Sequence, residues 1–250
     1  MLANFSYKRS RNKERFFIIA SFFALFITLI FLILGVIGYR FNFISIAVSL
    51  SILTRYGIYC ALITSIISLI SIGYSLKIQN KAGPLISSLA IFAVSSFIVV
   101  VFYGYVMSLR SNPFMNDIST NYDEALNFKI AKHDNPLQVN KIIQDYGGYK
   151  KPYNDLDSLY ISNSSFDETF YKSQIIFEKM NIEIKYKNLE EGIIEGESIS
   201  FWYGFKDDFI IRIEELISGD IRIDVRSASR VGRSDFGKNY HRINEFYSNF

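Results

Sequence analysis

The chain has 250 residues, half of them hydrophobic, and a net charge of +3. Its mean hydropathy of +0.17 excludes a disordered chain and a single uniform soluble domain. Residues 1–107 hold nine Lys/Arg and one acidic residue, whereas residues 108–250 hold 18 Lys/Arg and 23 acidic residues. The polar half is therefore acidic, which argues against a nucleic-acid-binding protein. The single cysteine, Cys60, excludes an intrachain disulfide.

Three uncharged apolar segments predict a transmembrane anchor over residues 1–107, with spans at about 16–38, 56–76 and 84–107. The first would form a helix of about 34 Å, enough to cross a hydrocarbon core of about 30 Å. It is longer than the apolar core of a signal peptide, so we interpret it as an uncleaved span. Because the span interiors contain no Asp, Glu, Lys, Arg or His, an anchor is favoured over a transport path.

Residues 41–54 are apolar but too short to span a bilayer. We predict that they form an interfacial or re-entrant segment, flanked by Arg40 and Arg55. The alternative extends the second span through Arg55 and would place a guanidinium in lipid, at about 2.5–3.5 kcal/mol.

The distribution of basic residues predicts the topology. The N-terminus and the loop between the second and third spans carry seven Lys/Arg, against three on the opposite side. We therefore predict a multi-pass protein of a bacterial inner (plasma) membrane. Its N-terminus would be cytoplasmic, and residues 108–250 would form a periplasmic or extracytoplasmic domain.

Hydrophobic periodicity in residues 108–250 predicts an α+β fold. One helix begins at Asn135-Pro136 and ends at Gly147-Gly148, and a second, with Ser165 and Glu168 as a capping box, ends near Met180. Alternation with a period of two then predicts four strands, around residues 182–186, 193–203, 209–213 and 221–225. A final helix follows with Ser234 as its N-cap. The expected fold is a four-stranded antiparallel meander with flanking helices.

The densest polar stretch is Asp224–Asp235, and it offers a candidate anion site. Arginines, hydroxyls and a helix N-terminus can together bind an anion, and the candidate residues are Arg226, Arg230, Arg233, Ser229 and Asp224. The alternative is structural, because nearby aspartates are numerous enough to pair with each arginine.

No catalytic residue and no metal ligand set is predicted. Asp207 and Asp208 are adjacent in a strand and should point to opposite faces. The two histidines have no spacing typical of a metal site, and no cofactor motif is present. The aromatic stretch 201–205 should pack in the core or in a turn, or alternatively contact a membrane interface.

Three stretches resemble the DUF1499 family, a bacterial and plastid domain of unknown function. They are FWYGFKDD at 201–208, DVRSASRVGRSDFGKN at 224–239 followed by Arg242-Ile243, and NDIST at 116–120. The resemblance covers roughly residues 110–250, and the spans with Tyr39-Arg40 and Arg55-Tyr56 are similar to membrane-anchored members. It implies no known activity or cofactor.

Three functional hypotheses follow. The first is a non-enzymatic membrane protein whose extracytoplasmic domain binds an envelope protein or an anionic lipid or glycan. The second is an enzyme acting on such a lipid or glycan, with Asp208 or Asp224 beside the arginines. The third is a structural subunit of a membrane complex, with the spans as the interface in the lipid bilayer.

Overall fold

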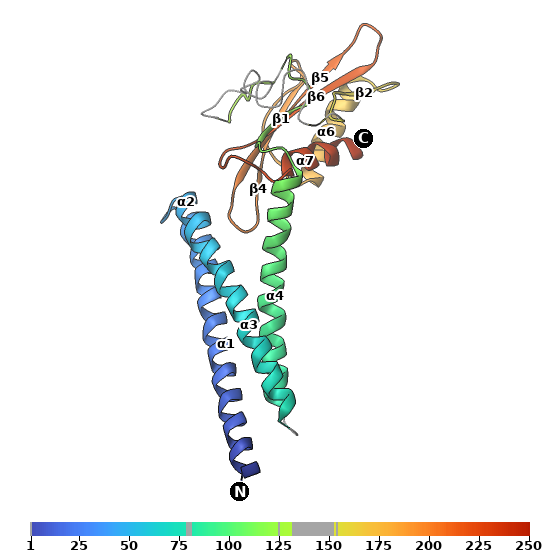
Figure 1. The fold of residues 1–250 in the computed structure, drawn as a ribbon. Helices are drawn as coiled ribbons and strands as arrows, with labels where there is room; N and C mark the ends of the chain where they lie inside the picture. The colour runs from blue at the N-terminus through green and yellow to red at the C-terminus, as the bar shows by residue number, and fades with distance from the viewer. Residues whose placement is uncertain (1, 79–81, 125, 132–152, 154) are drawn as a thin grey trace. The chain divides into compact units, whose positions relative to one another are not determined.

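The structure is a computed structural model that describes residues 2–78, 82–124, 126–131, 153 and 155–250. The chain divides into two compact units, Met1–Met107 and Ser108–Phe250, and each is described by itself. Figure 1 shows that the first unit is helical and the second contains the sheet.

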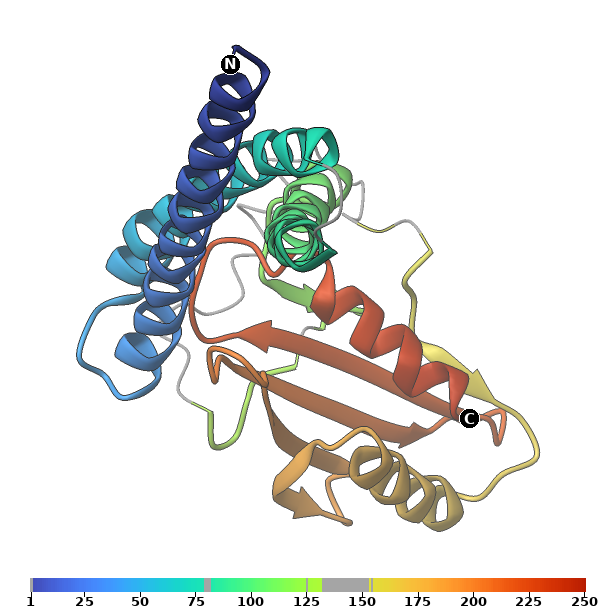
Figure 2. The same cartoon turned by 90° about the horizontal axis from the view of Figure 1, so that it is seen from below.

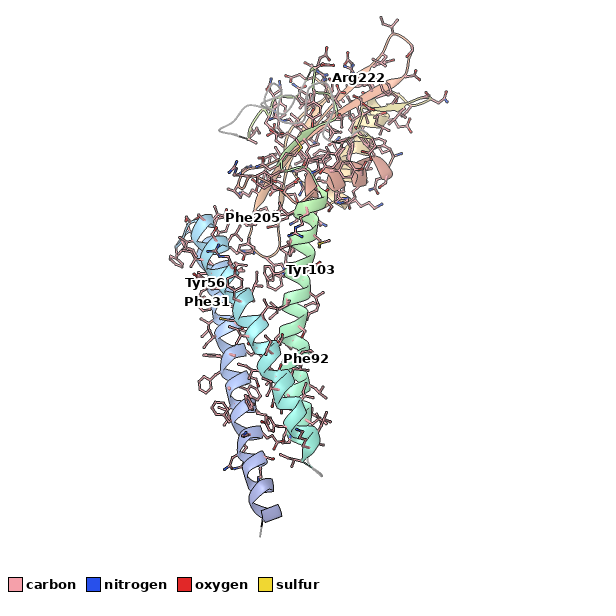
Figure 3. The ribbon with its side chains drawn as sticks, viewed as in Figure 1. Phe31, Tyr56, Phe92, Tyr103, Phe205 and Arg222 are labelled. Atoms are coloured by element: carbon pink, nitrogen blue, oxygen red, sulfur yellow. The ribbon has the colours of Figure 1, made fainter. Side chains whose placement is uncertain are left out.

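The first unit contains the three predicted apolar helices. They are α1 (Leu2–Arg40), α3 (Arg55–Lys77) and α4 (Ala82–Ser111), with the short helix α2 (Ile46–Val48) and the π-helix η1 (Ser49–Thr54) before α3. Within the described residues, three helical stretches are long and apolar enough to cross a membrane: Ser10–Arg40, Ile46–Lys77 and Ala82–Ser111. Large apolar side chains cover their outer surfaces (Figure 3).

Residues 41–54 comprise a turn followed by α2 and η1, which lead directly into α3. Residues 41–45 make the turn, and residues 46–54 continue into α3 because Ser49, Thr54 and Arg55 all have right-handed helical dihedral angles. The buried Ser49 hydroxyl donates to the carbonyl of Gly35 in α1 at 2.7 Å. This continuity agrees with the alternative in which the second span extends through Arg55. The depth of residues 41–54 in a bilayer stays a prediction.

Small and hydroxylated residues mediate the packing of these helices. Gly57 and Ala61 of α3 are buried, and a Cβ at Gly57 would lie 2.8 Å from a side-chain carbon of Leu32 in α1. Serine pairs join α3 to α4, with Ser65 bonded to Ser95 at 2.9 Å. Such small residues allow the close approach that membrane helices use.

The described residues of the second unit form one antiparallel sheet of six strands. They are β1 (Asp117–Ser119), β2 (Leu159–Ile161), β3 (Glu183–Asn188), β4 (Ile193–Ile199), β5 (Lys206–Glu215) and β6 (Ile221–Ser229). The order is β1-β6-β5-β4-β3, and β2 also pairs with β6. The predicted count of four is therefore wrong, and the sheet as a whole is not a four-stranded meander. The two missed strands have three residues each, too few to show an alternating pattern.

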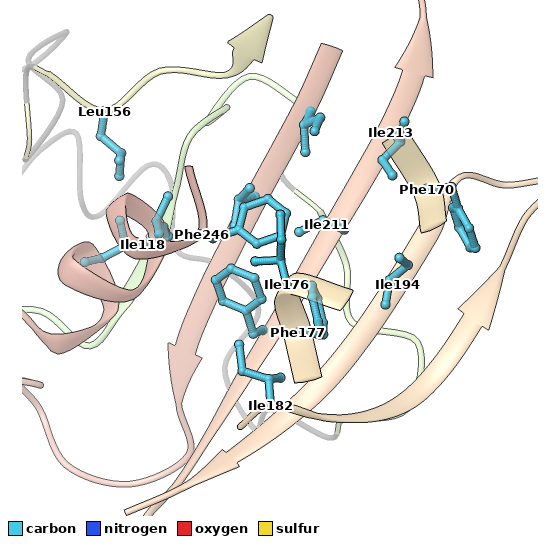
Figure 4. Close-up of a cluster of buried hydrophobic side chains, with 14 of the residues drawn as sticks. Ile118, Leu156, Phe170, Ile176, Phe177, Ile182, Ile194, Ile211, Ile213 and Phe246 are labelled. Carbon is cyan, nitrogen blue, oxygen red and sulfur yellow. The ribbon is translucent and has the colours of Figure 1, made fainter. Parts of the chain in front are cut away.

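Two helices, α6 (Phe166–Lys179) and α7 (Lys238–Ser248), cover one face of this sheet (Figure 2). Between sheet and helices lies the main core, which includes Phe177 and Phe246 (Figure 4). The rings of Phe177, Phe209 and Phe246 meet edge to face there at centroid distances of 5.3–5.9 Å. Their contacts join α6, β5 and α7 into one body. The helix predicted at 135–147 lies outside the described residues.

The helix ends show where the local signals sufficed. Ser165 caps α6 as predicted by accepting the Glu168 N–H at 3.2 Å. The predicted start of α7 at Ser234 is wrong. Phe236 and Gly237 have positive φ angles of 60° and 82°, so the chain turns there and the helix begins only at Lys238. Asp235 supplies the capping carboxylate instead of Ser234, accepting from the N–H of Gly237 and of Asn239.

Candidate functional site

The candidate site lies on the face of the sheet opposite α6 and α7, which we call the polar face. Alternate residues of β4, β5 and β6 point to it, and four of its carboxylates are almost fully buried: Glu195, Glu197, Asp208 and Asp224. Burial of a carboxylate is costly unless it is paired. The partners of these groups therefore determine what the face can do.

Arg226 lies in the middle of β6 and is buried, with 3% of its side chain exposed. Its Nε and Nη2 donate to the two oxygens of Asp117 in β1, at 3.0 and 2.7 Å. Its Nη1 donates to the carbonyl of Leu126 at 2.6 Å, and its guanidinium lies 4.7 Å from the ring centroid of Phe128. This arginine holds β1 and the segment after it on β6.

Arg230 follows the end of β6 and forms a second ion-pair group. Its Nε and Nη2 donate to Asp208 at 2.8 and 2.7 Å, and Nη2 also lies 2.6 Å from Glu197. Lys206 donates to the same Glu197 at 3.0 Å. The hydrogen bond to Asp208 raises the pKa of the Arg230 guanidinium above its ordinary value. Positive and negative charges are thus matched within this group.

Asp224 forms the third group. It accepts from Nη2 of Arg212 at 2.6 Å and from the hydroxyl of Ser158, and Nε of Arg222 lies 3.6 Å away. Arg222 also donates to Glu214 at 2.6 Å. A carboxylate held in this way is 1% exposed and offers no route for a substrate.

Glu195 of β4 forms a fourth contact on this face. Its two carboxylate oxygens accept from the backbone N–H groups of Lys129, Ile130 and Ala131, the bond from Ala131 being 2.8 Å long. The segment 126–131 is therefore fixed over part of the polar face, beside Ile193 and Ile210.

A separate buried network lies on the opposite face, under α7. Asp207 accepts from Arg242 at 2.7 Å, and Arg242 donates to the side-chain oxygen of Asn239 at 2.6 Å. The Asn239 amide donates to the Asn116 carbonyl at 2.9 Å and to the Ser229 hydroxyl at 3.2 Å. Asp207 and Asp208 thus point to opposite faces, as expected for neighbours in a strand.

The five predicted site residues do not converge on one point. Arg226, Arg230 and Asp224 each belong to a different ion-pair group, and Ser229 points toward Asn239 on the α7 face. Arg233 is exposed, with its guanidinium 5.6 Å from the ring centroid of Phe114. Among the described residues no carboxylate pairs with Arg233. The geometry of the stretch is therefore that of ion pairs that stabilise the fold. It agrees with the structural alternative to an anion site that the sequence left open.

Sequence reasoning missed the partners of this stretch. Asp117, Glu195 and Glu197 pair with groups far away in the chain, as do Asn239 and Arg242. Glu195 and Glu197 are two residues apart in β4 and can therefore be placed on one face of the sheet. The sequence does not reveal that the segment 126–131 covers part of this face. No group of three His, Cys, Asp or Glu residues within the described part of the chain could hold a metal ion.

A family model described as protein of unknown function (DUF1499) matches residues 117–250, which is more than half of the chain. No curated protein matches the sequence.

Proposed function

This chain belongs to the DUF1499 family, and we propose that it is a non-catalytic envelope protein. In this proposal the apolar helices anchor it in a bacterial inner membrane. Its sheet domain faces the periplasm or the extracytoplasmic side and binds another envelope protein, as a subunit of a membrane complex.

The observation that carries the proposal is the pairing of the polar residues in the family-like stretch. An anion ligand at Arg226 or Arg230 would have to displace carboxylates that already match the guanidinium charge, Asp117 and the buried Asp208. Catalysis by Asp208 or Asp224 would require a substrate to reach side chains that are 1% exposed. Both the anionic lipid or glycan ligand and the enzyme hypothesis are therefore disfavoured, and a scaffold role is favoured.

The charge bias supports the proposed orientation. Lys13, Arg15, Lys77 and further basic residues flank one end of the candidate spans, and only Arg40, Arg55 and Arg110 flank the other. Basic residues are retained preferentially on the cytoplasmic side. The domain that follows α4 would then lie outside the cytoplasm.

Photo-crosslinking in native membranes tests the partner. A photoreactive residue is placed singly at four exposed positions on separate parts of the domain: Tyr160, Ile175, Trp202 and Ile217. The proposal predicts a discrete adduct of constant, higher mass from at least one position. The same variants purified in detergent serve as the control and should give none. If none of the four positions gives a protein adduct in the membrane, the partner-binding role is wrong.

A further inference from the structure

The tip of the β4–β5 hairpin exposes aromatic side chains to an unusual degree. Phe201 is 82% and Trp202 67% exposed, and their rings contact each other edge to face at 5.5 Å. The backbone around them is closed by hydrogen bonds from Ser200 N–H to the Phe205 carbonyl at 2.8 Å and from Gly204 N–H to the Ser200 carbonyl at 3.0 Å. These rings are thus held outward by an ordered turn.

Strand register places this tip at one end of the strands. We call this end of the sheet the α4 edge and define it by residues 108–117, 200–206 and 229–237. The N–H of Arg230, just after β6, donates to the carbonyl of Lys206 at the start of β5. Asp117 at the start of β1 pairs with Ala228 near the end of β6. Figure 3 shows Phe205 at this end of the sheet and Arg222 at the other.

The chain enters the domain from its last apolar helix at this same edge. Ser108, the residue after the third predicted span, donates its hydroxyl to the carbonyl of Phe236 at 2.8 Å, and Asn112 donates to the same carbonyl at 3.4 Å. Ser108 lies in the last turn of α4, and Asn112 directly follows its last residue, Ser111. If residues 84–107 cross a bilayer, the α4 edge is the part of the domain that the covalent chain holds nearest to the end of that span, because Ser108 is the next residue in the sequence.

The chemistry of the α4 edge matches a lipid headgroup layer. Phe114 is 54% exposed there, with the guanidinium of Arg233 over its ring, and Arg110 is exposed in the last turn of α4. Tryptophan and other aromatic rings concentrate at membrane interfaces, where their apolar bodies leave water. Exposed arginines at the same level attract lipid phosphates.

We propose that Phe201 and Trp202 insert into the headgroup layer of the membrane that anchors the chain, with Phe114, Arg110 and Arg233 at the same level. The hairpin would be a second, peripheral membrane contact that fixes the domain against the bilayer surface. This inference goes beyond the proposed function, because it concerns lipid and does not depend on a protein partner.

The test uses intrinsic fluorescence, because Trp202 is the only tryptophan of the chain. The full-length protein is reconstituted into vesicles of equal parts phosphatidylcholine and phosphatidylglycerol, with bromine at a shallow or a deep position of the acyl chains. We expect shallow bromine to quench Trp202 more than deep bromine does, and acrylamide in the water to quench it weakly. Strong acrylamide quenching without bromine quenching would overturn the proposal. Weak quenching by both would overturn it too, because protein would then cover the ring.

Two single-tryptophan variants in a Trp202→Phe background calibrate the measurement. Ile217→Trp, at the fully exposed turn between β5 and β6, should be quenched by acrylamide and not by bromine. Phe97→Trp, on the outer surface of α4, should be quenched by deep bromine. If deep bromine does not quench Phe97→Trp, the anchor has not inserted into the membrane. This control therefore distinguishes failed insertion of the anchor from a wrong assignment of the hairpin.

Two serine variants test the contribution of the neighbouring ring. Phe201→Ser removes an apolar ring beside Trp202 and should lower its quenching by shallow bromine. Tyr160→Ser, which removes a ring of 60% exposure from β2 at the other end of the sheet, should leave that quenching unchanged. Equal effects of the two substitutions would contradict insertion of the hairpin.

Discussion

Substitution of Arg226 by alanine gives the strongest test of the structural role of the arginine stretch. Removing one partner of a buried ion pair costs about 3–5 kcal/mol of unfolding free energy. Asp117 keeps 20% exposure, so water relieves part of its lost pairing and favours the lower half of this range. The Leu126 carbonyl also loses its donor, at about 1 kcal/mol or more. We therefore expect Arg226→Ala to destabilise the domain by about 3–5 kcal/mol in total.

The other arginines provide a graded series. The Arg230 side chain is 32% exposed, but its removal leaves Asp208 without two short hydrogen bonds, so a loss of about 2–3 kcal/mol is expected, between the buried and exposed limits. Arg233 is exposed, so Arg233→Ala should cost about 0–1 kcal/mol. Arg226→Lys keeps the charge but not the planar guanidinium that binds both oxygens of Asp117. The unfolding free energy of this variant should therefore lie between those of the wild type and of Arg226→Ala.

Urea-dependent pulse proteolysis of the full-length chain in mild detergent measures these differences, with and without inorganic phosphate. The structural role predicts the order given above and no effect of phosphate on the wild type. Unchanged stability in Arg226→Ala would refute it. So would stabilisation of the wild type by phosphate that disappears in Arg230→Ala and Arg233→Ala, because such a result is the linkage expected of an anion site.

Three further predictions concern other parts of the chain. Glu195→Gln weakens charged hydrogen bonds to three backbone N–H groups and should cost about 1.5–3 kcal/mol; the exposed Glu183→Gln is its control in the same proteolysis assay, and equal effects would contradict the role of Glu195. Burial raises the pKa of Asp235 above its ordinary value of 3.8, so the stability that this carboxyl contributes is complete below 3.8 and is lost as the pH rises through its folded pKa. The unfolding free energy of the wild type minus that of Asp235→Asn should therefore increase as the pH falls from neutral toward 3.8, and urea titrations showing a constant difference would contradict this. Alkaline phosphatase fused after Phe250 should be active and a cytoplasm-dependent reporter inactive; the reverse pattern would contradict the topology.

Local sequence signals predicted the elements whose stability is local. The apolar segments are long enough to be helices on length alone, and α6 has both a serine cap and an apolar stripe ending at Phe177. The strands β3–β6 have six to ten residues each, and apolar and polar residues alternate clearly in β3 and in the first half of β6. In contrast, β1 and β2 exist because β6 offers them hydrogen-bonding partners, and no pattern within three residues encodes such a partner.

The candidate site was harder to predict because its meaning depends on distant pairing. Arg226 and Asp117 are separated by 109 positions, and in the sequence both are polar residues that could face water. Whether an arginine binds a ligand or a carboxylate of its own chain depends on which charges the fold brings within hydrogen-bonding distance. The composition of the stretch is the same in both cases, so composition alone left both alternatives open.

The pairing explains why one polar stretch can influence a whole domain. Arg226 ties β6 to β1, Arg230 ties the end of β6 to β5, and Arg242 ties α7 to β5. The bonds of Arg226 and Arg242 bridge elements that are distant in the sequence, and the bond of Arg230 reinforces the β5–β6 hairpin. The family match begins at Asp117, the partner of Arg226, so the matched region contains both members of each of these pairs. We infer that the arginine stretch is a signature of this fold, and that the exposed hairpin tip at Phe201 and Trp202 makes the lipid contact proposed above.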